Sequence, residues 1–352
     1  MQNKKISAIS EKEWQLANLL YARPRRRLVI LGFVLVALCL ASFCIGRYGV
    51  PLSQLLKIFA NLIFDIPKTW TDNMETVVFN IRLPRILLGC LVGGCLSAAG
   101  ASYQGVFQNP MAAPDILGAS SGAAFGAALA IFFGGSVSMI TALAFTFSLL
   151  TVCLVYLIGQ RARGARVLNL ILAGIMISSL FSAATSYIKL VADPNNILPQ
   201  ITYWLMGSLA GARMQEVLFA VIPMAAGLIP LFLLRWRINL LTLGDDEAKT
   251  MGINASLLRF IIIICATLIT AASVSVSGVI GWVGLVIPHL SRRFVGNNYK
   301  FLMPASILFG AIFMLVVDNV SRNLLATEIP IGILTAFVGA PFFIYLMMRR
   351  RG

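Results

Sequence analysis

Residues 84–107 read PRILLGCLVGGCLSAAGASYQGVF, a stretch of 24 residues whose only charged member is Arg85. A helix needs about 20 predominantly apolar residues to cross the hydrocarbon core of a bilayer. Gly89 and Gly93 are four residues apart, so they share one helical face, and small residues at this spacing let two helix backbones approach closely in lipid. The stretch therefore predicts a membrane-spanning helix that packs tightly against its neighbours.

Similar stretches recur along the whole chain. Hydrophobic residues make up 59% of the 352 residues, charged residues only 12%, and the mean hydropathy is +0.88. Soluble domains carry about 25% charged residues, so this composition excludes an ordinary soluble protein. We expect an all-α polytopic membrane protein with about ten transmembrane helices. The expected spans are 28–46, 84–107, 114–134, 137–159, 166–190, 214–236, 257–277, 282–296, 301–322 and 329–348.

The basic residues cluster at the ends of these stretches. If the N-terminus lies inside, 20 of the 28 Lys and Arg residues fall on the cytosolic side. The positive-inside rule then places both termini in the cytosol. The net charge of +15 is thus explained by topology and does not indicate a nucleic-acid partner. We divide the chain into a basic cytosolic tail, residues 1–27, and a single transmembrane domain, residues 28–352, which contacts membrane lipid directly.

Cofactor and metal motifs are missing from the sequence. The six cysteines all fall inside expected spans and show no CxxC spacing, so we expect neither a disulfide nor a metal site. The chain also lacks a GxxxxGK[ST] phosphate loop, so any ATP and Mg²⁺ must be bound by another polypeptide. We expect no cofactor and no catalytic residue in this chain.

Polar side chains follow one stripe of the fifth expected span. Ser178, Ser182, Thr185, Ser186 and Lys189 are spaced four, three, one and three residues apart, which places them on one side of a helix. Such a stripe can form hydrogen bonds between helices or line a hydrated path. A lysine near the membrane is costly without water or a partner, and Lys189 therefore favours a translocation path.

The inner connection, residues 237–256, is polar and long enough for a short helix. Three acidic residues, 245–247, suit the positive end of a helix dipole, and Gly252 is a plausible stop. We expect an apolar face directed away from the spans, formed by Leu243, Ala248, Met251 and Ile253. Such a helix could dock on a partner or simply connect two spans.

Six short motifs occur in order along the chain. They are RLPR at 82–85, NPMA at 109–112, LGASSG at 117–122, LGDDEA at 243–248 with Met251 and Gly252, GWVGLVIPH at 281–289, and PIG at 330–332 with Thr335, Gly339 and Pro341. Together they resemble the permeases of iron-siderophore and vitamin B12 ABC importers (the FecCD/BtuC type). The inner loop has Asp where Glu is more usual, and Trp282 replaces the commoner Phe.

The resemblance implies a type II importer in a bacterial inner membrane. Its permease would pair with a second permease subunit, identical or related, and with two ATPase subunits inside the cell. A periplasmic or lipid-anchored solute-binding protein would deliver the substrate from outside. The permease would then alternate between inward-open and outward-open states.

The resemblance also assigns roles to individual residues. Arg82, Arg85 and Arg322 would dock the binding protein through its carboxylates. Arg82 and Arg85 could instead anchor the chain at lipid headgroups. Arg322 could instead form an ion pair with Asp318, four residues before it. Asn109 and Met111 would belong to the cytosolic gate, or simply to an Asn-Pro turn. The ATPase-coupling residues would be Leu243, Gly244, Asp245, Asp246, Glu247, Ala248, Met251 and Gly252.

The substrate and the transport class leave alternatives. Ferric siderophore is the expected substrate, and haem, cobalamin or an oxyanion such as molybdate are alternatives within the same family. Residues 118–122 also fit GxSxG, so Ser120 and His289 could serve an intramembrane serine protease, but that motif marks a nucleophile only in a strand-turn-helix context. An ion-coupled carrier is disfavoured because the only deep acid expected, Asp318, has Arg322 as a partner.

Overall fold

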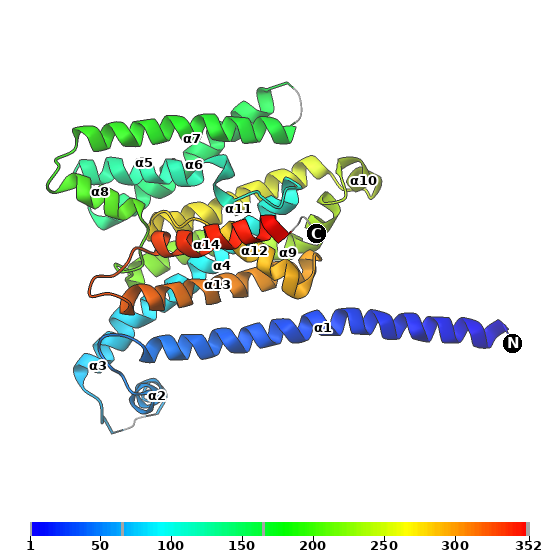
Figure 1. Cartoon of the computed structure of the whole chain (residues 1–352), viewed down its shortest axis with the longest axis horizontal. Helices are drawn as coiled ribbons and strands as arrows, with labels where there is room; N and C mark the ends of the chain where they lie inside the picture. The colour runs from blue at the N-terminus through cyan, green and yellow to red at the C-terminus, as the bar shows by residue number, and fades with distance from the viewer. Residues whose placement is uncertain (1, 65–66, 164–165, 350–352) are drawn as a thin grey trace.

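The computed structural model describes residues 2–64, 67–163 and 166–349, without the side chains of 2–22, 166, 245–246, 346–347 and 349. In this part of the chain every regular element is helical, and the long helices run side by side (Figure 1). The elements are α1 (Gln2–Cys44), α2 (Leu52–Ala60), α3 (Asp72–Thr76), η1 (Val77–Arg82), α4 (Leu83–Val106), η2 (Pro114–Leu117), α5 (Ala119–Phe132), α6 (Val137–Arg161), α7 (Arg166–Val191), α8 (Ile197–Leu205), α9 (Met214–Leu241), α10 (Asp245–Thr250), α11 (Ala255–Ser277), α12 (Val283–Val295), α13 (Tyr299–Asn323) and α14 (Ile331–Arg349).

All ten expected spans coincide with helices, namely α1, α4 to α7, α9 and α11 to α14. Seven described helical segments are long and apolar enough to cross a bilayer, whereas α5, α12 and α14 are shorter. Two boundaries differ from expectation. The 1–27 tail is not separated from the first span, because α1 continues through Pro24. The second span begins earlier, because α3, the π-helix η1 and α4 form one segment, Asp72–Val106.

Helix α4 forms the centre of the molecule and is buried along most of its length. A Cβ atom on Gly93 would lie 2.2 Å from the carbonyl oxygen of Gly310 in α13, and one on Gly100 would lie 1.8 Å from that of Gly284 in α12. Only glycine permits backbones at these distances, so the expected small-residue packing of this span is confirmed. Three helices are thereby joined backbone to backbone.

Helices α5, α6 and α7 form a second group beside this centre (Figure 1). A Cβ atom on Gly122 would lie 2.0 Å from the Thr151 hydroxyl oxygen, and one on Gly126 would lie 2.3 Å from the Leu143 carbonyl oxygen. These two glycines therefore set the spacing between α5 and α6. The second group meets the centre through α11, which packs against both α5 and α4.

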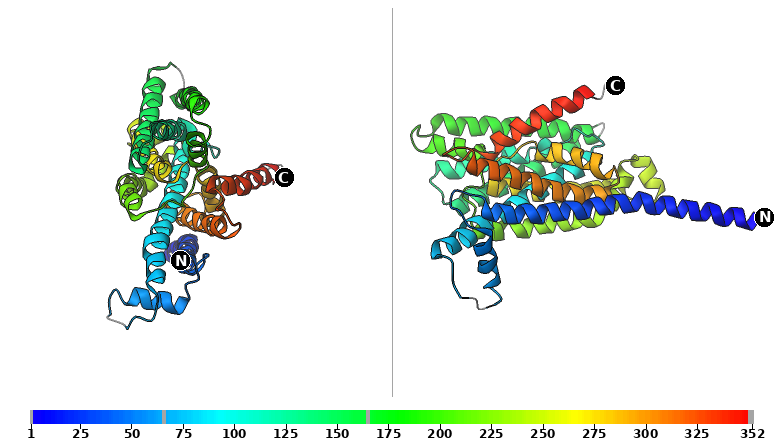
Figure 2. Two further views of the ribbon diagram at one scale, coloured as in Figure 1. Left: turned by 90° about the vertical axis from the view of Figure 1, so that its left-hand side faces the viewer. Right: turned by 60° about the horizontal axis from the view of Figure 1, so that its bottom comes forward.

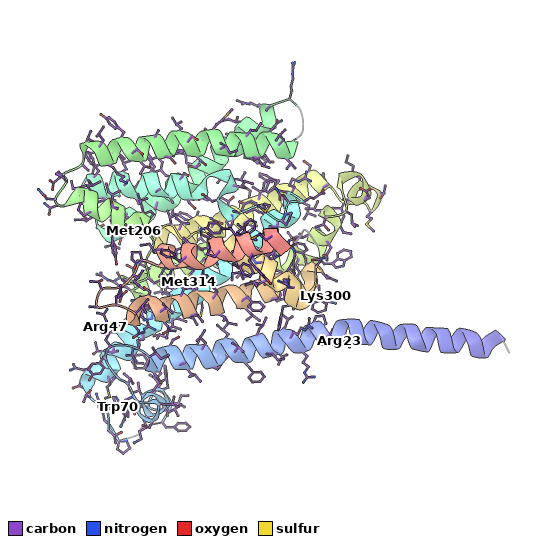
Figure 3. All side chains as sticks on the ribbon, viewed as in Figure 1. Arg23, Arg47, Trp70, Met206, Lys300 and Met314 are labelled. Atoms are coloured by element: carbon purple, nitrogen blue, oxygen red, sulfur yellow. The ribbon has the colours of Figure 1, made fainter. Side chains whose placement is uncertain are left out.

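The two ends of the bundle carry different segments of the chain. Figure 3 places Arg23 and Lys300 toward one end, and Arg47 and Trp70 at the other. Helix α10 and the connection from α6 to α7 lie at the first end, which we call the inner end, and α2, α3 and α8 lie at the second, the outer end (Figure 1). This arrangement agrees with the alternation of spans that the sequence predicts.

Helix α14 projects from the body of the molecule (Figure 2, left). Its first residues are held at the outer end, where the Ile331 N–H donates to the Gly207 carbonyl at 2.9 Å and the Gly332 N–H donates to that of Met206 at 3.1 Å. Beyond this anchor its apolar side chains are exposed, with Phe337 75% accessible. The helix therefore presents a largely uncovered apolar surface.

Candidate functional site: a polar cavity between α5 and α7

A polar cavity of about 290 Å³ lies between the start of α5 and the outer half of α7. We call it the polar cavity; its lining is Asp115, Ser120, Ser121, Ala124, Ser182, Thr185, Ser186, Lys189, Leu205 and Val279. Four of the five residues expected on a translocation path, Ser182, Thr185, Ser186 and Lys189, share it. Ser178 does not line it and instead lies against Gly118. The structure thus brings most of the predicted stripe to one cavity, together with Ser120 and Ser121 of the LGASSG motif and with Asp115, which the sequence did not single out.

The charged groups of the cavity lie at different depths. Lys189 follows the first residue of α7 by 23 positions, or ~35 Å along the axis, which is close to the outer end. Ser178 follows it by 12 positions, ~18 Å, and touches the turn that carries Asp115 and Ser120. The cavity therefore runs from a cation at its outer edge to a carboxylate near the middle of the bundle.

Local chain geometry fixes Asp115 in this position. Residues 114–117 form a short 3-10 helix, and Gly118 then adopts φ +78°, a left-handed conformation that glycine tolerates best. The chain turns there, and an Asp115 carboxylate oxygen accepts the Ser120 N–H at 2.8 Å. Asp115 thus caps α5. It is a second deep acid, so the expectation that Asp318 is the only one was wrong.

The hydroxyl groups on α7 are partly committed to their own helix. Thr185 donates to the Phe181 carbonyl at 2.8 Å, and Ser186 donates to the Ser182 carbonyl at 2.9 Å. Each hydroxyl oxygen still has lone pairs that can accept a hydrogen bond. The cavity wall therefore combines hydroxyl acceptors with one ammonium and one carboxylate.

The expected cytosolic gate lies in the turn that follows α4 at the inner end. The Asn109 side-chain oxygen accepts the Met111 N–H at 2.9 Å, and the Met111 side chain is exposed. The preceding residue, Gln108, has φ +50°, and its side-chain amide donates to the Leu241 carbonyl, the last residue of α9, at 2.7 Å. The turn is therefore tied directly to the helix that leads into α10.

The short helix of the inner connection is present as α10, Asp245–Thr250. It starts after Gly244, φ +128°, and the chain leaves it at Gly252, φ +76°, so both glycines occupy left-handed positions. Leu243 and Met251 are exposed as expected, at 58% and 60%. Ala248, however, is fully buried, so the expected apolar face was partly wrong.

The inward position of Ala248 has a simple cause. Its methyl group faces α9 and α11, the helices against which α10 packs, and the Ile253 N–H donates to its carbonyl at 3.1 Å. The side chain of Glu247 is exposed, and those of Asp245 and Asp246 lie outside the described residues. The exposed apolar part of the element therefore consists of Leu243 and Met251.

A polar network at the inner end joins three helices of the centre. Arg292 of α12 donates to the side-chain oxygen of Gln104 in α4, and to the Tyr299 hydroxyl at 3.1 Å. The Tyr299 hydroxyl in turn donates to the Ala101 carbonyl at 3.0 Å. No sequence pattern singled out these residues, because they come from separate spans and meet only in the folded chain.

The three arginines expected to dock a binding protein are buried. Arg82 and Arg85 are 3% and 4% accessible, and Arg322 is 8% accessible. Arg82 donates to the carbonyls of Phe43 and Tyr48, at the end of α1 and in the loop that follows it. Neither headgroup anchoring nor docking by free side chains describes this arrangement, because the guanidinium groups are already engaged inside the chain.

Arg85 is the centre of a buried ion network. Its Nε lies 2.8 Å from an Asp318 carboxylate oxygen, and its two terminal nitrogens reach both oxygens of Glu328 at 3.0 and 2.8 Å. Asp318 also lies 3.3 Å from Nε of Arg322, the intrahelical pair that the sequence offered as an alternative. Glu328 could not be found from spacing, since it lies 243 residues from Arg85.

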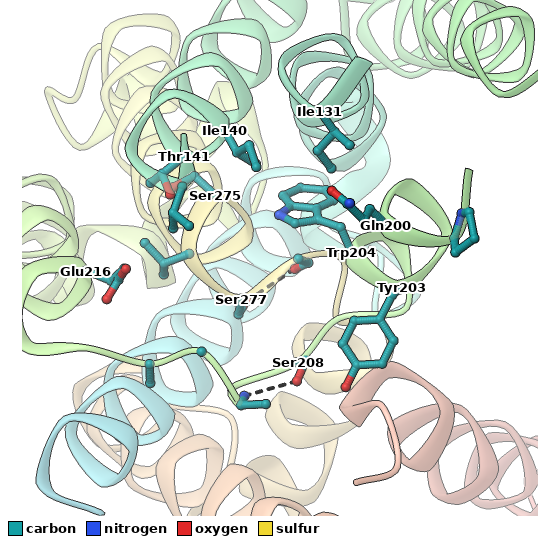
Figure 4. Close-up of a pocket in the computed structure, with 17 residues that line it drawn as sticks. Ile131, Ile140, Thr141, Gln200, Tyr203, Trp204, Ser208, Glu216, Ser275 and Ser277 are labelled. Atoms are coloured by element: carbon teal, nitrogen blue, oxygen red, sulfur yellow. Dashed lines mark hydrogen bonds between the residues drawn. The ribbon is translucent and has the colours of Figure 1, made fainter. Parts of the chain in front are cut away.

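A larger cavity of about 570 Å³ lies at the outer end, on the other side of α8 (Figure 4). Figure 4 shows Gln200 and Trp204 of α8 between Ile131 of α5 and Ser277 of α11. Its lining is mostly apolar. Leu205, the last residue of α8, faces the polar cavity and also a third, apolar cavity at the base of α14. Helix α8 is therefore bordered by cavities on more than one side.

The serine-protease alternative finds no support in the geometry. Ser120 lies in the first turn of α5, and Gly118 and Gly122 serve the turn and the packing against α6. His289 lies on α12, which continues through Pro288, and it does not line the cavity that contains Ser120. The GxSxG pattern is thus explained by the helix start.

Comparison with known proteins gives the family. The sequence profile of the FecCD transport family matches residues 34–349, which is most of the chain. The chain belongs to the FecCD transport family. It is 41% identical to the molybdate import system permease protein MolB of Haemophilus influenzae over 325 residues, covering 92% of this chain and 95% of that protein. It is 43% identical over 281 residues to a probable iron chelatin transport system permease protein of Helicobacter pylori, covering 80% of this chain and 85% of that protein.

A solved structure supports the same conclusion. A chain described as an inward-facing conformation of a proposed metal-chelate type ABC transporter has a TM-score of 0.83 and 40% identity, covering 92% of this chain and 99% of that one. As a FecCD-family member, this membrane-spanning chain is an ABC transporter permease and not an enzyme, and ATP is hydrolysed by a separate ATPase subunit. The family imports metal chelates, haem, cobalamin or molybdate.

Proposed function

We propose that this permease imports a ferric siderophore or a related metal chelate by alternating access, and that the polar cavity is one wall of its path. The observation that carries the proposal is the cavity itself, in which hydroxyl groups line one continuous space from Lys189 at its outer edge to Asp115 near the middle of the bundle. A polar wall inside a membrane protein is costly unless it faces water or a polar substrate.

A second permease copy would complete the path. The polar cavity shares Leu205 and Val279 with the apolar cavity at the base of α14, and the exposed face of α14 begins there. A partner subunit on that face would cover exposed Phe337 and Val338 and enclose the polar wall between two chains. Cysteines at these two positions should cross-link two permease subunits in membranes, and failure at both would contradict this arrangement.

The ATPase would bind at α10 and drive the gate turn. Leu243 and Met251 offer the exposed apolar contact, and α10 follows α9, whose last carbonyl is held by Gln108 beside Asn109. Movement of α10 would therefore reach the gate turn through one hydrogen bond. In this orientation the protein lies in the inner membrane of a bacterial cell, with residues 1–27 and both termini in the cytosol. A solute-binding protein delivers the substrate on the outer side.

The coupling role can be tested without disturbing the fold. Leu243→Glu and Met251→Glu place a charge on two exposed side chains of the inner connection. We expect the double variant to assemble in the membrane but to lose substrate uptake and substrate-stimulated ATP hydrolysis. Arg163→Glu, at an exposed position on a different inner connection, is the matched control. Normal uptake by the double variant would exclude α10 as the coupling element.

The substrate class has a specific rival. The similarity to MolB favours an oxyanion, and Lys189 at the outer edge of the cavity would attract one. Asp115 deeper in the same cavity would repel it, whereas hydroxyl groups and mixed charges suit a hydroxyl-bearing chelate. Uptake of radiolabelled ferric siderophore and of radiolabelled molybdate, each supplied with the cognate binding protein, separates the two. Molybdate uptake without iron uptake would overturn the iron assignment.

A further inference from the structure

Two adjoining cavities lie at the inner end, beside the loop that follows α10. The first, of about 530 Å³, opens between the end of α9 and the start of α11, and we call it the α9–α11 groove. Its walls are mainly Leu234, Trp236, Leu240, Leu257 and Ile261, with Arg237 as the charged member, and Met251 of the proposed ATPase contact also lines it. The second cavity shares Gly252, Ile253 and Asn254 with the groove and is also lined by Lys249 and Arg259.

The groove lies at the level of the inner headgroups. Arg237 follows Met214, the first residue of α9, by 23 positions, which corresponds to ~35 Å along the axis. The hydrocarbon core is about 30 Å thick, so a helix that begins at the outer interface brings Arg237 just beyond the inner boundary of that core. Trp236 is 60% accessible, and tryptophan is enriched at this interface.

The groove separates apolar and charged surface along its length. Leu257 on α11 and Leu233 on α9 are exposed, at 54% and 73%. Leu233 lies one helical turn on the hydrocarbon side of Arg237, which follows it by four residues and is also exposed. Among the side chains that the structure describes, three cations and no acid line the two cavities, namely Arg237, Lys249 and Arg259. The acyl carbons of a lipid would contact the apolar side chains, and its phosphate would contact the cationic side chains.

We infer that the α9–α11 groove binds the headgroup of an anionic phospholipid from the inner leaflet. The phosphodiester lies at Arg237, whose planar guanidinium can donate two parallel hydrogen bonds to phosphate oxygens. The glycerol and first acyl carbons lie along Leu234, Leu257 and Ile261, under the Trp236 indole. Basic pockets between membrane helices on the cytosolic side recognise anionic lipids in this way. The occupied groove would brace residues 251–254, which hold α10 in place.

The test is retention of lipid by the assembled transporter. Native mass spectrometry after titration with phosphatidylglycerol or phosphatidylcholine of the same acyl length should show preferential retention of phosphatidylglycerol. Arg237→Gln should reduce that retention by about fivefold, the effect of one lost basic contact near a membrane surface. Arg237→Lys should restore part of it, because the charge returns without the planar fork.

Arg161→Gln is the matched control, since Arg161 is exposed at the inner end of α6 and lines neither cavity. Size-exclusion profiles and melting temperatures establish that each variant is folded. Two results would overturn the inference. One is equal retention of the two lipids, and the other is an equal loss in Arg161→Gln and Arg237→Gln, which would indicate a diffuse charge effect.

Discussion

Replacing Arg85 by Met decides between a structural and a docking role for this arginine. The substitution keeps most of the side-chain volume but removes the guanidinium that reaches Asp318 and Glu328. The Asp318 side chain is only 2% accessible, so its carboxylate cannot be hydrated in place of the lost partner. The variant therefore leaves a buried anion with Arg322 alone, at 3.3 Å.

The expected cost follows from this burial. Removing one partner of a buried ion pair typically costs 3–5 kcal/mol, and the remaining Arg322 contact favours the lower end, ~3 kcal/mol. A loss of that size should lower the melting temperature of a 352-residue chain by ~4 °C. Glu328→Gln should cost no more than ~1 kcal/mol, because its side chain is 29% accessible and the bond between Arg85 and Asp318 remains. Arg85→Met with Asp318→Asn should recover part of the loss, since no unpaired buried carboxylate is left.

The assay combines thermal unfolding of the purified permease with affinity for the cognate binding protein. We expect every variant to melt at a lower temperature than the native chain. From most to least stable, the order should be Glu328→Gln, then Arg85→Met with Asp318→Asn, then Arg85→Met alone. An unchanged melting temperature together with weakened affinity for the binding protein would refute the structural assignment. That outcome would restore the docking role that the sequence suggested.

Three further predictions test other parts of the structure. Gly93→Leu should prevent correct folding at a cost of about 3 kcal/mol or more, because its Cβ would lie 2.2 Å from the Gly310 carbonyl oxygen. Size-exclusion chromatography of detergent extracts checks this. Gly32→Leu is the control and should behave like the native chain, because open space surrounds Gly32. Tyr299→Phe should cost about 1–3 kcal/mol by stranding its inner-end partners, Arg292 and the Ala101 carbonyl, and unaltered thermal unfolding would contradict the network. In the outer loop before the second span, hydrogen bonds to Asp72 and Glu75 raise the pKa of Lys68, so this ion cluster persists until pH rises through the raised value. Asp72→Asn should move the base-induced change in Trp70 fluorescence, isolated by comparison with Trp70→Phe, to lower pH, and a shift to higher pH would exclude the assignment.

Hydrophobic patterning predicted the fold well because lipid imposes a simple rule on backbone groups. Every span must be a helix, because its backbone groups can form hydrogen bonds only within the segment, and each long apolar stretch therefore indicates one helix. All ten spans were found for that reason. The GxxxG spacing of residues 89 and 93 predicted close packing, although only Gly93 makes a contact too tight for a Cβ atom.

The candidate site was only partly predictable. The stripe from Ser182 to Lys189 could be found because helical spacing places it on one face. Asp115 was not singled out from the sequence, and only the fold brings it into the same cavity. The burial of the arginines was not predictable either, since Arg85 meets a glutamate from a loop near the other end of the sequence. Ala248 faces inward because two long helices flank α10, which local sequence does not reveal.

The contact between Gly93 and Gly310 restricts how the protein can change shape. Two helices whose backbones touch without intervening side chains cannot slide or rotate past each other without a collision. In the alternating-access cycle proposed above, the movement would then be carried by elements around α4 and α13, such as α8 and α14. The distance between two spin labels, one on α4 and one on α13, should therefore stay constant through the transport cycle. That distance could serve as a fixed reference when distances to the moving helices are measured.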